Sequence, residues 1–387
     1  MKNNLKFYII FAAILITQSS LSVFATTNQC EPLFTDKLSQ KNTSRTEETV
    51  KKIAPQISKP ENTEPKWASR YTHGHVVIAE KQYQMAYIEQ IPDVWNGKTI
   101  VLVPGLSKSA LFYEEHAALF LAQGYRVLRF DPFNINETLR VNGSKPLHEM
   151  SLEQDAEGIA QIVKSLNLAE GSVQIAGHSR GAGVTVHLAL LLGKKLVYRV
   201  TLVNPFVSWL SDYAVKDLTK KIESVLHLNP MTLFAPPAFK NYVDRMASYF
   251  SRQYAQGTID FMMSVTDFKD FLRKALRHRD SSENTGLRLE DEVNALYVMF
   301  TNLKNVSILP QAKQLAELGF DVDVVTVGKK PGQKDDLVPE EAGRDLRHAL
   351  SIQEGSAQDI RVDGTHYYPT ENPQGFVNVV TRANTQP

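Results

Sequence analysis

The sequence predicts an α/β fold built on a mostly parallel sheet. Beyond Lys66, short β-rich runs alternate with amphipathic runs of helical length, and several of the short runs are apolar throughout. Strands that are apolar on both faces are typical of parallel sheets covered by helices on each side. The composition is that of an ordinary globular protein, because 43% of the residues are hydrophobic and 22% are charged.

The expected elements follow one another in an order that fits this class. Two β-rich runs, His75–Ala79 and Gln84–Glu89, predict a hairpin. The runs expected to form buried strands are Thr99–Val103, Arg126–Phe130, Val173–Ala176, Tyr198–Val203, Val322–Val327 and Asp359–Val362. The runs with helical periodicity are Ala110–Gln123, Ser151–Leu168 and Val184–Leu192, followed by a final stretch from Pro373.

Charge and cysteine content exclude several classes of protein. Lys and Arg number 43 against 42 Asp and Glu, and the net charge of +1 gives no basic surface for nucleic-acid phosphates. The one cysteine, Cys30, cannot form an intrachain disulfide or a thiolate metal cluster, and we expect it to be a free thiol. A nucleic-acid partner is therefore not expected.

Residues 1–25 are typical of a secretory signal peptide. A basic start is followed by the apolar run Phe7–Ile16, and small residues precede a cleavage site after Ala25. Such a run rises only about 15 Å as a helix, too little to cross a ~30 Å hydrocarbon layer. We expect a periplasmic or secreted chain with no stable membrane span after signal cleavage. Residues 26–66 are polar and predict a disordered tail.

The motif that indicates chemistry spans Gly177 to Gly181 and spells G-H-S-R-G, a G-x-S-x-G pattern. The expected strand Val173–Ala176 ends directly before it, and a helical run follows it. This is the setting of a nucleophile elbow, in which a strained turn exposes Ser179 and small residues let strand and helix pass closely. The alternative interpretation is a glycine-rich turn with a capping serine.

With this context the sequence resembles the α/β-hydrolase family. The run Thr99–Ser109, T-I-V-L-V-P-G-L-S-K-S, is similar to the family's third strand and oxyanion turn, although Pro104 replaces the usual His. The resemblance implies an eight-stranded, mostly parallel sheet flanked by helices, with the backbone N–H groups of Leu106 and Arg180 as an oxyanion hole. The run Arg126–Pro132, R-V-L-R-F-D-P, is similar to the family's fourth strand with its terminal Asp, and Asp131 is expected to be structural.

The resemblance also selects a general base. The segment Asp363–Pro373, D-G-T-H-Y-Y-P-T-E-N-P, is similar to the family's catalytic-histidine segment and points to His366. His178 lies within the elbow and is expected to face away from the nucleophile. His73 and His75 share one face of a β run, but no acidic third ligand for a metal is expected nearby.

The acid is expected after the seventh strand. The segment that follows Val322–Val327 contains a glycine, two aspartates and Val-Pro, and the family's spacing selects Asp335, with Asp336 as a near rival. A different seventh strand, Leu296–Phe300, would place Asn305 at the acid position. Asp335 is preferred because an amide cannot balance an imidazolium.

The same resemblance divides the chain into parts. A hydrolase core is expected at 67–205 and 293–387, with a helical cap at 206–292 inserted after the sixth strand. Aromatic and methionine residues are plentiful in the cap, where they are expected to form its own core. Some of them are candidates to line an apolar acyl or aryl pocket over Ser179.

These assignments predict a secreted serine hydrolase that cleaves an ester-type bond through Ser179, His366 and Asp335, in the Ser…Asp…His chain order of this fold. The expected partner is a small-molecule or lipid-like acyl substrate, and no cofactor or metal is expected. One alternative is a peptidase or amidase of the same fold, which no sequence feature separates from an esterase. Another is a non-catalytic secreted binding protein, which a missing triad residue would mark, and none is missing.

Overall fold

The computed structural model describes residues 70–208, 269, 287–303, 306–328, 335, 338 and 340–382. All of them belong to the compact unit Glu64–Pro387. The expected signal peptide, the expected tail and most of the expected cap lie outside the described residues, as does Asp336. Within the described part of the chain, no helix has the length and apolar character that a membrane span needs.

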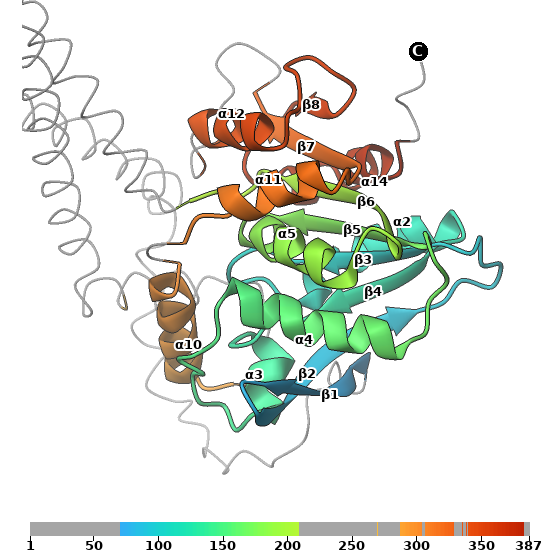
Figure 1. Cartoon of the computed structure of the whole chain (residues 1–387). Helices are drawn as coiled ribbons and strands as arrows, with labels where there is room; N and C mark the ends of the chain where they lie inside the picture. The colour runs from blue at the N-terminus through green and yellow to red at the C-terminus, as the bar shows by residue number, and fades with distance from the viewer. Residues whose placement is uncertain are drawn as a thin grey trace, which may run out of the picture. The chain divides into compact units, whose positions relative to one another are not determined.

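An eight-stranded sheet forms the centre of this unit (Figure 1), with the strand order β1-β2-β4-β3-β5-β6-β7-β8. The strands are β1 (Thr72–Ile78), β2 (Lys81–Gln90), β3 (Thr99–Val103), β4 (Arg126–Phe130), β5 (Val173–His178), β6 (Val197–Val203), β7 (Val322–Val327) and β8 (Asp359–Val362). The hairpin β1–β2 and the pair β2–β4 are antiparallel. All the other pairs are parallel, so the sheet is mostly parallel as predicted.

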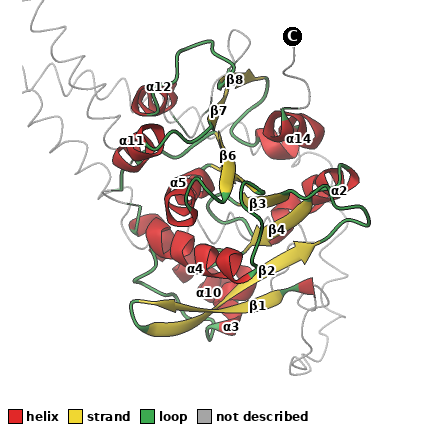
Figure 2. Ribbon diagram, turned by 45° about the vertical axis from the view of Figure 1, so that its right-hand side comes forward, coloured by secondary structure: helices red, strands yellow, loops and turns green. Residues whose placement is uncertain are grey.

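Helices cover both faces of the sheet (Figure 2). One face carries α4 (Leu152–Ser165), α5 (Arg180–Leu192), α11 (Leu309–Glu317) and α12 (Glu340–Ala349), and the other carries α2 (Glu114–Ala122) and α14 (Pro373–Thr381). Shorter elements are η3 (Ala110–Tyr113), α3 (Asn136–Val141) and α13 (Tyr368–Glu371). The helix α10 (Leu289–Thr301) lies beside α3 and contributes to a small apolar cluster with Ile135.

The two-residue period of a strand explains why two cores form. In β3, Val101 and Val103 point into the larger core, while Ile100 and Leu102 point into the core under α2 and α14. All four side chains are buried. The mostly apolar runs that predicted buried strands therefore result from a sheet that is covered on both faces.

The structure decides between the two candidates for the seventh strand. Val322–Val327 is β7 and pairs in parallel with β6 and β8. Leu296–Phe300 is wrong as a strand, because these residues lie inside α10. Helix α10 also crosses the expected boundary between the cap, 206–292, and the second part of the core, 293–387.

Candidate active site

Ser179 occupies the turn between β5 and α5. Its backbone has φ 53° and ψ −121°, in a region that side-chain-bearing residues rarely adopt. The turn is held by backbone hydrogen bonds, because the Ser179 N–H donates to the Val203 carbonyl at 2.9 Å and its carbonyl accepts from the Phe206 N–H at 3.0 Å. Strand β6 and the chain after it thus fix the strained turn.

Glycines on either side of Ser179 let β5, α5 and β3 approach closely. A Cβ on Gly181 would overlap the carbonyl oxygens of Val103 and Pro104, and one on Gly177 would overlap the Gly181 carbonyl. These contacts are to backbone, which cannot move aside as a flexible side chain can. The glycines of the motif are therefore required by packing.

His366 lies within hydrogen-bonding distance of both Ser179 and Asp335. His366 Nε2 lies 2.9 Å from Ser179 Oγ, and His366 Nδ1 lies 2.8 Å from Asp335 Oδ2 and 3.0 Å from Oδ1. A carboxylate only accepts, so Nδ1 carries the proton and Nε2 offers its lone pair to the serine hydroxyl. The three residues follow β5, β7 and β8, whose parallel carboxyl ends share one edge of the sheet.

The turn that carries His366 is tied to the helix after it. The Thr365 N–H donates to Glu371 Oε2 at 2.8 Å, and the Thr365 hydroxyl donates to the other oxygen of the same carboxylate. Asn372 caps α14 by accepting from the Gly375 N–H at 2.8 Å. Glu371, the acidic residue that follows His366 in this segment, therefore has a structural role, because it holds Thr365.

Asp335 is also held by the backbone. Its Oδ1 accepts from the Val338 N–H at 2.8 Å, an Asx-type contact across the turn. The carboxylate is largely buried, with 9% of its side chain exposed. Its neighbour Asp336, the other candidate acid, lies outside the described residues.

Of the two residues expected to form an oxyanion hole, Arg180 directly follows Ser179 and Leu106 directly follows Gly105, which packs against Ser179. Gly105 packs so closely on the elbow that a Cβ placed on it would lie 3.2 Å from Ser179 Cβ, which brings the turn with Leu106 up to the serine. Arg180 is the first residue of α5. The N-terminus of a helix favours negative charge, because its first N–H groups have no partner within the helix.

The side chain of Arg180 points away from this chemistry into an ion pair. Its Nη2 lies 2.5 Å from Asp155 Oδ2 on α4, and both side chains are buried. The other oxygen of Asp155 accepts from the Phe133 N–H at 2.7 Å. The pair connects α5, α4 and the segment after β4.

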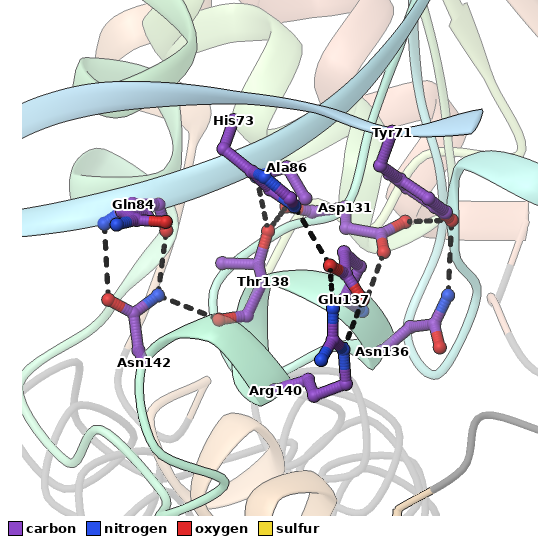
Figure 3. A network of polar contacts seen from close by, with 10 residues as sticks. All are labelled: Tyr71, His73, Gln84, Ala86, Asp131, Asn136, Glu137, Thr138, Arg140 and Asn142. Carbon is purple, nitrogen blue, oxygen red and sulfur yellow. Dashed lines mark hydrogen bonds and ion pairs between the residues drawn. The ribbon is translucent and has the colours of Figure 1, made fainter. Parts of the chain in front are cut away.

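Asp131 is the centre of a buried polar network (Figure 3). Its carboxylate accepts from the N–H of Ala110 at 2.6 Å, the N–H of Glu137 at 3.0 Å and the Tyr71 hydroxyl at 3.2 Å. Burial raises the pKa of Asp131 to about 7, and the three donors oppose this shift. The contacts join η3, which directly follows the turn with Leu106, to α3 and the chain before β1.

An acidic residue, Glu137, lies beside His73, although no acidic third ligand was expected near His73 and His75. His73 Nε2 lies 2.8 Å from Glu137 Oε1, a residue 64 positions away in the sequence (Figure 3). Arg140 binds both oxygens of the same buried carboxylate at 2.6 Å. Across the described ranges, no group of three His, Cys, Asp or Glu side chains is arranged to hold a metal.

Residues 100–379 match the model of the family described as "Alpha/beta hydrolase family". The search of curated proteins finds no match.

Solved structures of similar fold include several hydrolases. A thermophilic esterase from Thermogutta terrifontis is 13% identical, with a TM-score of 0.50, and the match covers 81% of this chain and 97% of the other. A probable hydrolytic enzyme from Pseudomonas aeruginosa is 16% identical, with a TM-score of 0.47 and coverage of 84% and 96%. An esterase from Exiguobacterium antarcticum is 12% identical, with a TM-score of 0.47 and coverage of 81% and 99%.

At such identities the likeness concerns the fold alone. The family match is the stronger finding, because it spans β3 to α14 and includes Ser179, Asp335 and His366. It agrees with the eight-stranded sheet and the strand-turn-helix at Ser179. The chain belongs to the alpha/beta hydrolase family.

Proposed function

We propose that the protein is a serine hydrolase that cleaves esters through an acyl-enzyme. The observation that carries the proposal is the continuous contact from Ser179 Oγ to His366 Nε2 and from His366 Nδ1 to Asp335. In this arrangement His366 takes the hydroxyl proton as Ser179 Oγ attacks the carbonyl carbon. Asp335 keeps the proton on Nδ1 and stabilises the imidazolium that forms.

The later steps use the same residues, with His366 acting first as an acid and then again as a base. His366 Nε2–H donates its proton to the leaving alkoxide, which leaves the acyl group on Ser179. A water then loses a proton to His366 and attacks the acyl carbon, which releases the acid and restores the serine. Each proton that His366 takes up is returned, so the cycle needs no other co-reactant.

We assign the oxyanion hole to the backbone N–H groups of Leu106 and Arg180. Two observations support the assignment, the packing of Gly105 on the elbow and the position of Arg180 at the start of the thirteen-residue helix α5. Oriented donors at this place stabilise the negative charge of the tetrahedral intermediate more than that of the ester carbonyl.

The substrate we propose carries an apolar acyl group. Leu106, which is partly exposed, packs against a cluster formed by Ile135, Leu296 and Met299. This apolar cluster adjoins the turn that carries a proposed oxyanion donor. An aliphatic or aromatic acyl chain suits such a surface better than a charged one.

Export of the protein is part of the proposal. It is supported by the basic start and the short apolar run before Ala25. Expression in an exporting bacterium should yield a chain that begins at Thr26 in the periplasm or the medium. Recovery of exported protein with Met1 intact would contradict this.

The catalytic proposal is tested with an active-site label and a substrate panel. A fluorophosphonate should label wild-type protein at Ser179, and Ser179→Ala should lower turnover by roughly 10⁴-fold or more. Hydrolysis of p-nitrophenyl esters of increasing chain length, measured beside aminoacyl amides, separates an esterase from a peptidase. Labelling at another serine would overturn the assignment of the nucleophile, and no labelling or turnover at all would favour a binding protein.

A further inference from the structure

A second histidine, His178, is buried beside the candidate active site. It is the last residue of β5, and 3% of its surface is exposed. Its Nε2 lies 2.7 Å from the backbone carbonyl oxygen of His366. A carbonyl oxygen only accepts hydrogen bonds, so His178 Nε2 carries the proton and donates a hydrogen bond to it.

The same carbonyl receives a second donor. Asn204, which directly follows β6, donates from Nδ2 to the His366 oxygen at 3.1 Å and to the Thr365 oxygen at 3.3 Å. Two elements of the sheet thus hold one peptide group of the histidine turn. The side chain of His366 is held at its other end by Asp335.

The environment of His178 keeps its ring neutral. Burial is the largest of the causes that together lower the pKa of His178 to about 3. The charges of His366 and Lys108 act in the same direction, while Asp335 and the contact with the His366 carbonyl oppose the shift. The ring of His178 lies 4.9 Å from the ring of His366 and 6.0 Å from that of Phe112. A second cation at 4.9 Å would disfavour the imidazolium that His366 forms during turnover.

We infer that His178 and Asn204 are positioning residues, which hold the backbone of His366 so that its Nε2 stays aligned with Ser179 Oγ. The inference rests on the proposed hydrolase function. A ring fixed at Nδ1 alone is free to pivot about that contact, whereas a ring whose backbone is also fixed keeps its distance of 2.9 Å to the serine. Misalignment of a base by about 1 Å is enough to slow a reaction roughly 10²-fold.

The chain offers a matched control in His116 on α2. This residue is also buried, and its Nε2 lies 2.8 Å from the Pro369 carbonyl oxygen. In both histidines Nδ1 is buried without a hydrogen-bond partner, and Phe112 stacks on both rings. His116 holds a carbonyl three residues beyond His366, so it shares the physical setting of His178 without the contact to the base.

The experiment compares Gln and Met at both positions in the full-length protein. Gln places an N–H about as far from the backbone as His Nε2 does, and Met is of similar length with no donor. His178→Met should lower kcat roughly 10- to 100-fold with KM changed less than about twofold, and His178→Gln should retain most of the wild-type kcat. His116→Met should lose a similar amount of thermal stability with kcat within about threefold of wild type.

A readout independent of substrate accompanies the kinetics. The Nδ1–H of His366, bound to Asp335, gives a strongly downfield proton resonance in nuclear magnetic resonance spectra. It should broaden or vanish in His178→Met and persist in His178→Gln and His116→Met. If His178→Met does not fold, Asn204→Ala takes its place in every comparison, because Asn204 donates to the same carbonyl.

The outcomes separate the inference from the function on which it rests. Wild-type kcat in His178→Met, equal losses in the Gln and Met variants, or an equal loss of kcat in His116→Met would overturn the positioning role. Failure of the fluorophosphonate to label wild-type Ser179 would instead overturn the hydrolase proposal. In that case the downfield resonance still reports whether His178 holds His366 in place.

Discussion

At the scale of single residues, the site combines a strained backbone with side chains held at both ends. Ser179 keeps its positive φ because hydrogen bonds to Val203 and Phe206 fix the turn. Asp335 is held by the Val338 N–H on one side and faces His366 on the other. These contacts fix the side chains before the substrate binds. Less conformational entropy is therefore lost when the transition state forms.

The two adjacent aspartates should differ sharply in their effect on activity. Asp335→Asn keeps the shape of the side chain but loses the charge that, in the proposed mechanism, stabilises the His366 imidazolium, and it no longer enforces the Nδ1–H tautomer. We expect kcat to fall on the order of 10³- to 10⁴-fold, as measured with a p-nitrophenyl ester. Asp336→Asn is the matched control and should change kcat little. The opposite ranking would move the acid role to Asp336.

The sequence identified the candidate triad but not its supports. Ser179 and His366 stand in local motifs, so their neighbours in the sequence are enough to select them. The contact of His178 with His366 joins residues 188 positions apart, and that of His73 with Glu137 spans 64. No local pattern encodes contacts of this kind, because only the packed sheet brings the partners together.

At the scale of elements, the crossing of α5 over the sheet is set by two glycines with different neighbours. Gly181 faces the backbone carbonyls of Val103 and Pro104. Gly183 faces Leu152 Cδ1, the far end of a flexible side chain, at 3.0 Å. A methyl group is therefore excluded at the first position and nearly accommodated at the second.

This contrast gives a test by stability. Gly181→Ala should lower the free energy of unfolding by about 2 kcal/mol or more, because β3 and α5 must separate. Gly183→Ala should stay within about 1 kcal/mol of wild type, since the gain in helix propensity offsets a small shift of Leu152. Urea denaturation measures both values. Equal losses would mean that the crossing is looser than the contacts of Gly181 indicate.

Some elements can be predicted from the sequence more exactly than others. The runs Thr99–Val103, Arg126–Phe130 and Val322–Val327 agree with β3, β4 and β7 to the residue, because the side chains of a strand buried on both faces are mostly apolar and do not alternate regularly with polar ones. Leu296–Phe300 is equally apolar but belongs to α10, since a short apolar run fits either structure. The acidic first turn of α10, Glu290 to Glu292, was the available signal for a helix.

At the scale of the whole molecule, buried histidines couple stability to pH. Burial lowers the pKa of His116, of His187 and, to about 3, of His178. The unfolded chain binds protons at histidines below about pH 6.5, whereas the folded chain does not until its lowered pKa values are reached. These residues therefore contribute stability that is present above about pH 6.5 and is lost as the pH falls.

The coupling is measured by comparing wild type with His116→Gln. The variant lacks one titrating group, so the advantage of wild type in free energy of unfolding should shrink between pH 7 and pH 5. Denaturation by urea at the two pH values gives the difference. In this difference, the contribution of the carboxylates to the pH dependence of stability cancels, because both proteins contain them. An advantage that is the same at both pH values would contradict the neutral, buried state of His116.

The strand order has a consequence for when the protein becomes active. Ser179 precedes His366 by 187 residues, and His366 follows β8, an edge strand of the sheet and the last strand among the described residues. A chain that emerges from its amino end can assemble the central strands early, yet it lacks the proposed base until β8 docks beside β7. Refolding from urea should restore helical circular dichroism before it restores labelling of Ser179. The strand order therefore predicts that the proposed hydrolysis begins only once folding is complete.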